Sequence, residues 1–206
     1  MSETIKRKNR MLALGLTGGI GMGKSTAAKA LNAMGFPVYH ADYAVHEALR
    51  KGGKAVRQVA RLFPEALRNG AIDRKILGRF VFGHPRKLKQ LEKILHPFVW
   101  QAEAAFLKQA HRDKASAVIL EIPLLFETGG EGRFDAVLCV TAPYAIQKAR
   151  VLARPGMTEA RFKAIRARQM KDSEKRKKAD YIIHTGKGLA DTRKQLKRVM
   201  KHLLKA

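Results

Sequence analysis

The chain has 206 residues and a formal net charge of +25, from 42 lysines and arginines against 17 acidic residues. Its hydrophobic fraction of 46% excludes a disordered chain and predicts one globular domain that can carry insertions. No apolar run is long enough to cross a bilayer and no signal peptide is indicated. The single cysteine, Cys139, excludes an internal disulfide, so we expect a cytoplasmic protein.

Short apolar runs alternate with amphipathic segments along the chain. This alternation predicts an α/β fold of three layers, α/β/α, with a parallel sheet in the middle. The expected strands are residues 12–16, 36–40, 117–120, 136–140 and 181–183. The expected helices are residues 25–34 and 191–204, with two mainly helical insertions at 43–112 and 145–178. Glycine and proline are expected to break the first insertion at 52–53, 69–70 and 83–85 and the second at 154–156.

The segment from Gly18 to Ser25 fits the phosphate-binding pattern G-x-x-x-x-G-K-[ST] and lies between an expected strand and an expected helix. Glycines let successive backbone N–H groups surround a phosphate, and the helix dipole favours the same anion. The sequence therefore predicts a nucleoside triphosphate site, with Lys24 on the β- and γ-phosphates and the Ser25 hydroxyl on Mg²⁺. The expected nucleotide-binding residues are Gly21, Met22, Gly23, Lys24, Ser25 and Thr26.

Two carboxylates follow expected strands. Asp42 comes after the second strand, and ligands of open α/β sheets bind at the carboxyl ends of strands. A carboxylate there could orient an acceptor hydroxyl and take its proton, or it could cap the helix that starts near Tyr43. Glu121, at the tip of the third strand, could contact Mg²⁺ through water or be an ordinary strand-end charge.

Arg150 and Arg154 are four residues apart and share one face of a basic helix. Guanidinium groups bind phosphate oxygens and can stabilise a transferred phosphoryl group, but a solvated basic face fits the same pattern. His96, which precedes a proline, is by itself more typical of a structural residue than of a catalyst. The seven histidines are scattered, so no structural zinc is expected.

Much of the positive charge lies after residue 145. It suits a nucleic-acid-binding NTPase, a phosphate-rich small substrate or a solvated basic surface. Because charge alone does not select nucleic acid, we do not expect nucleic acid as the partner. Neither an N-K-x-D nor a D-x-x-G segment follows the loop, which disfavours a signalling GTPase.

Several segments together resemble the dephospho-CoA kinase family. The L-E-K-I-L-H-P and I-P-L-L-F-E segments are more specific than the loop, and the likeness spans residues 12–204. The segments that carry it are Leu16 to Thr26, Ala41-Asp42, Ile72-Asp73-Arg74, Leu91 to Pro97, Ile122 to Glu127, Gln147 with Arg150 and Arg154, Gln169, and Ala179-Asp180.

The resemblance implies a P-loop NTPase fold with a five-stranded parallel sheet. Residues 11–206 would form one kinase domain, with an inserted CoA-binding subdomain at 43–112, a lid at 145–178, and a basic N-terminal arm at 1–10. The implied reaction is phosphorylation of the ribose 3′-hydroxyl of dephospho-CoA by ATP with Mg²⁺, the last step of coenzyme A biosynthesis. The expected partners are these small molecules, with no membrane partner and a monomer or weak homo-oligomer as the assembly. The implied catalytic residues are Asp42, Lys24 and Arg150, the implied substrate-binding residues are Asp42, Arg74, His96 and Arg154, and the metal ligand is Ser25.

Two positions depart from the family pattern. The second strand ends in His40-Ala41-Asp42, where the family often has Asp-Ala-Asp, so a neutral or cationic group replaces an auxiliary acid. Near the C-terminus, His184-Thr185-Gly186 lacks the usual asparagine before the glycine turn, so the contact with adenine is expected to differ in detail.

Overall fold

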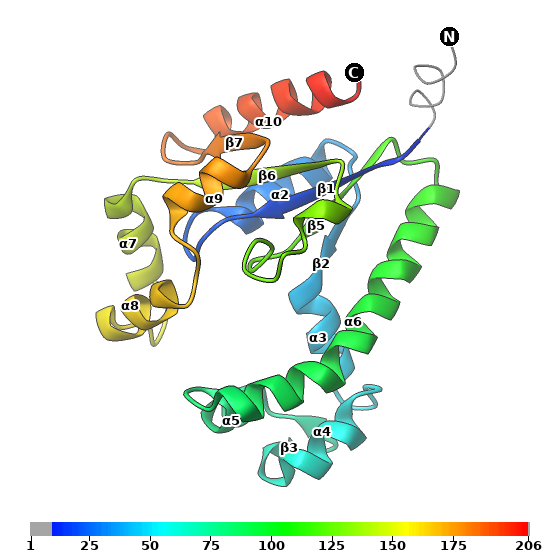
Figure 1. Ribbon diagram of the computed structural model, residues 1–206, viewed down its shortest axis with the longest axis vertical. Helices are drawn as coiled ribbons and strands as arrows, with labels where there is room; N and C mark the ends of the chain where they lie inside the picture. The colour runs from blue at the N-terminus through cyan, green and yellow to red at the C-terminus, as the bar shows by residue number, and fades with distance from the viewer. Residues whose placement is uncertain (1–9, 206) are drawn as a thin grey trace. The chain divides into compact units, whose positions relative to one another are not determined.

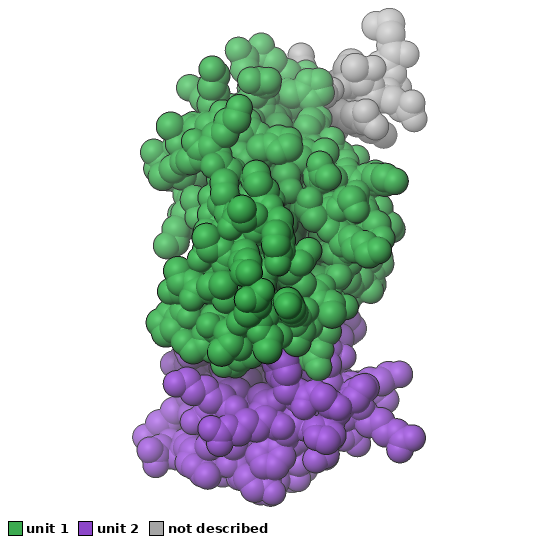
Figure 2. Space-filling view, turned by 90° about the vertical axis from the view of Figure 1, so that its left-hand side faces the viewer, with its two compact units in different colours: residues 1–39, 110–206 green, residues 40–109 purple. Residues whose placement is uncertain are grey.

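The computed structural model describes residues 10–205, so the basic arm expected at residues 1–10 lies outside the described residues except for Arg10. The chain divides into two compact units, which Figure 2 shows in different colours. The first unit contains residues 1–39 and 110–206, and the second contains residues 40–109. Within residues 10–205, no helix is both long enough and apolar enough to span a membrane.

A five-stranded parallel sheet forms the centre of the first unit, in the order β2-β5-β1-β6-β7 (Figure 1). The central strand β1 places Leu14 opposite Ile119 of β5 and opposite Ala136 of β6. Because such a sheet is covered on both faces, its inner strands are nearly continuous apolar runs, and β6 is buried throughout. The predicted fold class is therefore confirmed. The strands are β1 (Leu12–Thr17), β2 (Val38–His40), β5 (Ala117–Glu121), β6 (Ala136–Thr141) and β7 (Tyr181–His184).

Helices complete the outer layers of the first unit. On one face, α2 (Lys24–Ala33) and α10 (Leu189–Leu203) bury Leu31, Leu196 and Met200 against the sheet. On the other face, the segment 122–134, with a short 3-10 turn at Glu131–Arg133, packs Leu125 and Phe126 on Val137. The helix α9 (Asp172–Lys178) lies against β6, and α7 (Tyr144–Leu152) contacts α8 (Glu159–Ala167).

The second unit is mainly helical. Its apolar side chains, among them Leu49, Val59, Phe63, Leu77 and Leu91, form a core of their own. The breaks expected at 52–53 and 83–85 do fall between helices. The helices are α3 (Ala41–Leu49), α4 (Val56–Leu62), a 3-10 turn at Pro64–Ala66, α5 (Arg74–Val81) and α6 (Pro85–Arg112), the last of which continues into the first unit.

At Asn69-Gly70 the chain forms a hairpin where the sequence predicted only a break between helices. The strands β3 (Leu67–Arg68) and β4 (Ala71–Ile72) pair antiparallel. Asn69 and Gly70 have φ values of +49° and +78°, as a two-residue turn between such strands requires. Each strand has only two residues, which is too short for an alternating pattern to be visible in the sequence.

The basic segment between the break at 154–156 and Lys178 forms two helices, so the second insertion has a further interruption that the sequence did not predict. The helix α8 ends at Ala167 and α9 begins at Asp172. Between them, the Met170 N–H donates to Glu127 Oε1 at 2.8 Å instead of to a helical carbonyl. A carboxylate from a distant segment thus replaces the helical hydrogen bond at this point.

Candidate active site

The loop between β1 and α2 has the geometry of a phosphate-binding loop. Gly23 precedes α2 with a φ of +91°, and a Cβ at this position would lie 3.0 Å from Thr185 Oγ1. Glycine adopts this conformation without strain and lets the two segments approach closely. The N-terminus of α2, where the helix dipole is positive, therefore begins directly at Lys24.

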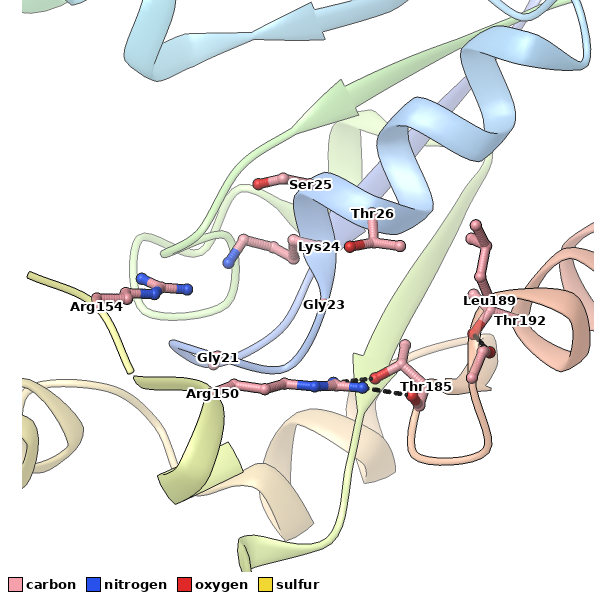
Figure 3. A pocket seen from close by; sticks show the side chains of 12 residues that line it. Gly21, Gly23, Lys24, Ser25, Thr26, Arg150, Arg154, Thr185, Leu189 and Thr192 are labelled. Atoms are coloured by element: carbon pink, nitrogen blue, oxygen red, sulfur yellow. Dashed lines mark hydrogen bonds between the residues drawn. The ribbon is translucent and has the colours of Figure 1, made fainter. Parts of the chain in front are cut away.

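A cavity of about 240 Å³ opens beside this loop (Figure 3). Most of the predicted nucleotide-binding residues line it, but Met22 does not. Met22 is buried, and its Sδ accepts a hydrogen bond from the Ala142 N–H at 3.1 Å. The lining residues are Gly19, Gly21, Gly23, Lys24, Ser25, Thr26, Arg150, Arg154, Thr185, Gly188, Leu189 and Thr192.

Ser25 meets a carboxylate from the end of a neighbouring strand. Its Oγ donates to Glu121 Oε1 at 3.4 Å, and Glu121 is the last residue of β5. Mg²⁺ prefers oxygen ligands and is commonly held by one or two protein oxygens, with phosphate and water completing its octahedron. The Ser25 and Glu121 oxygens fit this requirement, which favours the metal interpretation of Glu121 over an ordinary strand-end charge.

The cations of the cavity come from different elements. Lys24 Nζ donates to the Gly18 carbonyl at 3.0 Å. Arg150, in the last turn of α7, donates to Thr185 Oγ1 at 2.9 Å and to the Thr185 carbonyl at 2.7 Å. Figure 3 shows Arg154 and Lys24 turned towards the same space. Positive charge thus surrounds a space of a size that suits phosphate groups.

Thr185 links this arginine to the phosphate loop. Its hydroxyl accepts from Arg150 and donates to the Met22 carbonyl at 2.8 Å. Because a guanidinium has five N–H donors, two bonds to Thr185 orient Arg150 and leave donors for a ligand. Arg150 is therefore held at the cavity and is not simply part of a solvated basic helix face.

Asp42 lies in the second unit, in the first turn of α3, which begins at Ala41. The residue that precedes this helix is His40, and no side chain caps its N-terminus. The interpretation of Asp42 as an N-cap is therefore wrong. Its exposed carboxylate follows β2 directly and is not used to start the helix.

Arg74 and His96 also lie in the second unit. Arg74 is the exposed first residue of α5, and Asp73 caps this helix by accepting from the N–H groups of Lys75 and Ile76 at 2.8 and 3.0 Å. His96 is exposed on α6, with its ring centroid 5.6 Å from that of Trp100. Arg74 and His96 are therefore both accessible within this unit.

Sequence reasoning missed the cavity wall that the start of α10 forms. Gly188, Leu189 and Thr192 line the cavity together with Thr185. Their position just after β7 was an available signal, because ligands of parallel sheets lie at the carboxyl ends of strands.

The parallel sheet, the glycine loop before α2 and the cations around its cavity define a P-loop kinase. A model of the family described as dephospho-CoA kinase matches residues 12–191. The chain therefore belongs to the dephospho-CoA kinase family.

Individual relatives agree with this assignment. The dephospho-CoA kinase of Brucella melitensis is 45% identical over 190 residues, which cover 92% of this chain and 94% of that protein. The dephospho-CoA kinase of Paramagnetospirillum magneticum is 54% identical over 166 residues, which cover 81% of this chain and 78% of that protein.

Solved structures show the same likeness. The dephospho-CoA kinase from Campylobacter jejuni has a TM-score of 0.63 at 27% identity and covers 97% of this chain and all (100%) of that chain. A Thermus thermophilus protein reaches a TM-score of 0.81 at 38% identity and covers 94% of this chain and 98% of its own. A shikimate kinase from Acinetobacter baumannii, at 16% identity and a TM-score of 0.53, shares the fold alone.

Proposed function

We propose that this protein transfers the γ-phosphoryl group of ATP to the ribose 3′-hydroxyl of dephospho-CoA, giving ADP and coenzyme A. Family membership supports this reaction. The observation that carries the proposal is the cavity in which the start of α2 meets Lys24, Ser25, Arg150 and Arg154. Such an arrangement suits phosphoryl transfer, where catalysis depends on positioning and on neutralising charge.

The donor half of the site lies in the first unit. In this proposal the loop N–H groups and Lys24 bind the β- and γ-phosphates, and Lys24 exchanges its bond to the Gly18 carbonyl for a phosphate oxygen. Ser25 and Glu121 would hold Mg²⁺, which supplies positive charge against the phosphate oxygens. Arg150 and Arg154 would stabilise the group in transfer, and residues 145–178 would act as a lid that excludes water.

The acceptor half of the proposal involves the second unit. Asp42 would orient the attacking 3′-hydroxyl and accept its proton. The insertion 43–112 would bind dephospho-CoA, with Arg74 and His96 as contacts, since both side chains are exposed. A cytoplasmic location, in keeping with the single cysteine, is part of the same proposal, and so is a monomer or weak homo-oligomer as the assembly.

ADP release from ATP and Mg²⁺, with and without dephospho-CoA, tests the function. We expect release to depend on dephospho-CoA and mass spectrometry to find one phosphate added to it. Asp42→Asn should leave ATP binding intact and lower phosphoryl transfer by about a hundredfold or more. Glu65→Gln removes another exposed carboxylate of the second unit and is the matched control, expected to behave as wild type.

Two outcomes would contradict the proposal. Normal turnover by Asp42→Asn would exclude this residue as the base. ADP release that ignores dephospho-CoA but rises with RNA or DNA would show that the charge of the chain, rather than its family, indicates the substrate.

A further inference from the structure

Two glutamine side chains hold the main chain of one residue in the phosphate loop. Gln147 Nε2 donates to the Ile20 carbonyl at 2.8 Å, and the Ile20 N–H donates to Gln169 Oε1 at 2.9 Å. A backbone N–H can only donate and a carbonyl can only accept, so the loop itself determines both amide orientations. The two side chains therefore hold the peptide groups on either side of Ile20.

Gln147 belongs to α7, and this helix packs directly on the loop. Gln147 is only 3% exposed. Gly21 has a φ of +73°, and a Cβ there would lie 2.5 Å from Val151 Cγ2 and 3.0 Å from the Gln147 carbonyl oxygen. Because Arg150 stands on the same helix, α7 carries both a support of the loop and a cation of the cavity.

A buried ion pair holds the segment that carries Gln169. The next residue, Met170, donates its N–H to Glu127 Oε1 at 2.8 Å. Lys175 Nζ lies 2.8 Å from the same carboxylate oxygen, donates to the Pro123 carbonyl at 3.1 Å, and has no exposed surface. Gln169 thus reaches the loop from a position that is secured by a separate network.

We propose that Gln147 and Gln169 are positioning residues that hold the phosphate loop at Ile20 in one place relative to α7. Neither side chain lines the nucleotide cavity; both line a second cavity together with Gly19 and Met22, and both reach the loop through the Ile20 backbone. The inference rests on the proposed nucleotide site and adds two residues that control its geometry. A displacement of about 1 Å in a reacting group can lower a rate on the order of 100-fold, so a loosened loop should impair transfer more than binding.

Substitutions of similar size test this at position 147, where a donor is needed. Gln147→Glu places a carboxylate oxygen against the Ile20 carbonyl, and Gln147→Met removes the donor without adding charge. We expect both variants to lower kcat/KM for ATP by about 10- to 100-fold, with most of the loss in kcat.

Position 169 needs a hydrogen-bond acceptor, so the response to substitution there should differ from that at position 147. Gln169→Glu keeps an acceptor for the Ile20 N–H. Lys163, Arg166 and Lys171 line a second cavity together with Gln169, separate from the nucleotide cavity, and their positive charge offsets that of the new carboxylate. We expect this variant to retain most of its activity, whereas Gln169→Met should lose about tenfold in kcat. An effect of the added charge alone would impair both glutamate variants, so tolerance of Glu at position 169 but not at position 147 identifies the hydrogen-bond direction that each position needs.

Gln195 offers a matched control outside the loop. It holds the backbone of His184 in the same manner, accepting from its N–H at 2.9 Å and donating to its carbonyl at 2.8 Å. Thr185 keeps its own bond, from its N–H to the Thr141 carbonyl at 2.8 Å. We expect Gln195→Met to lower the melting temperature and to leave kcat unchanged.

The outcomes separate this inference from the proposed function. If the wild-type protein shows no ATP-induced rise in melting temperature, the nucleotide site itself is wrong. If the wild type binds ATP but Gln147→Met and Gln169→Met lower only the melting temperature, as Gln195→Met does, the positioning role is overturned. The positioning role is supported if Gln147→Met, Gln147→Glu and Gln169→Met lower kcat while Gln169→Glu retains most of its activity.

Discussion

Replacing Lys175 by methionine is expected to lower the free energy of unfolding by about 3–5 kcal/mol. Lys175 is fully buried, and its Nζ serves both Glu127 and the Pro123 carbonyl. Methionine fills a similar volume but donates no hydrogen bond. The Glu127 side chain, only 17% exposed, would lose its cation, and the Pro123 carbonyl would keep only the weaker bond from the Thr17 hydroxyl at 3.3 Å.

A double-mutant cycle measures the coupling free energy between Lys175 and Glu127 separately from the effect of each single substitution. Glu127→Gln alone leaves a buried ammonium group opposite a neutral amide, so it should also destabilise the fold. In the double variant neither charge is left uncompensated. We therefore expect its loss to be smaller than the sum of the two single losses by about 1–3 kcal/mol.

Urea unfolding followed by circular dichroism measures these changes as shifts in midpoint at constant slope. For a chain of this size, 3–5 kcal/mol corresponds to a fall of about 6–20 °C in melting temperature. The control is Lys178→Met, which breaks a second ion pair of α9. In that pair Lys178 Nζ lies 3.0 Å from Glu131 Oε1, and the Lys178 side chain is 49% exposed. Its loss should be much smaller because the groups stay solvated. A loss below about 1 kcal/mol for Lys175→Met, or an additive cycle, would refute the reasoning.

Three further outcomes follow from the site and the core. Gly23→Ala should abolish the ATP binding that calorimetry measures, because a side chain at a φ of +91° is strained and its Cβ would lie 3.0 Å from Thr185 Oγ1. An affinity equal to that of the wild type would contradict this. Thr185→Val removes the hydroxyl that joins Arg150 to the Met22 carbonyl, so kcat should fall about tenfold while ATP affinity changes little, and an unaltered kcat would count against this role. Burial raises the pKa of Cys139 to about 11, so the thiol is protonated at neutral pH. It should react with a disulfide reagent only after the protein is unfolded in urea. Rapid labelling of the native protein would contradict this.

The phosphate loop could be predicted because its chemistry is local. Its glycines, Lys24 and Ser25 are consecutive, and the apolar strand before them and the helix after them are visible as patterns of a few residues. The inner strands β1, β5 and β6 were predictable for the same reason, since parallel strands buried on both faces are continuous apolar runs. The structure extends β1, β5, β6 and β7 by one residue each beyond the expected ends, and β2 begins at Val38 rather than at Phe36.

Features that depend on a distant partner were not predictable in this way. The short hairpin at Asn69-Gly70 has too few residues for a pattern. The division between α8 and α9 depends on Glu127, which is 43 residues away from Met170. Asp42 could be either a cap or a free carboxylate from its sequence position, and only the start of α3 at Ala41 decided between them.

The sequence by itself determined the local elements, the phosphate loop and the likeness to the dephospho-CoA kinases, because each depends on residue types at short spacing. Only the tertiary structure decided which side chains support that loop. Ile20 and Gln169 are 149 residues apart, and Ser25 and Glu121 are 96 apart, so no short pattern in the chain connects them. Such contacts form where the carboxyl ends of parallel strands come together, and this convergence depends on the packing of the whole sheet.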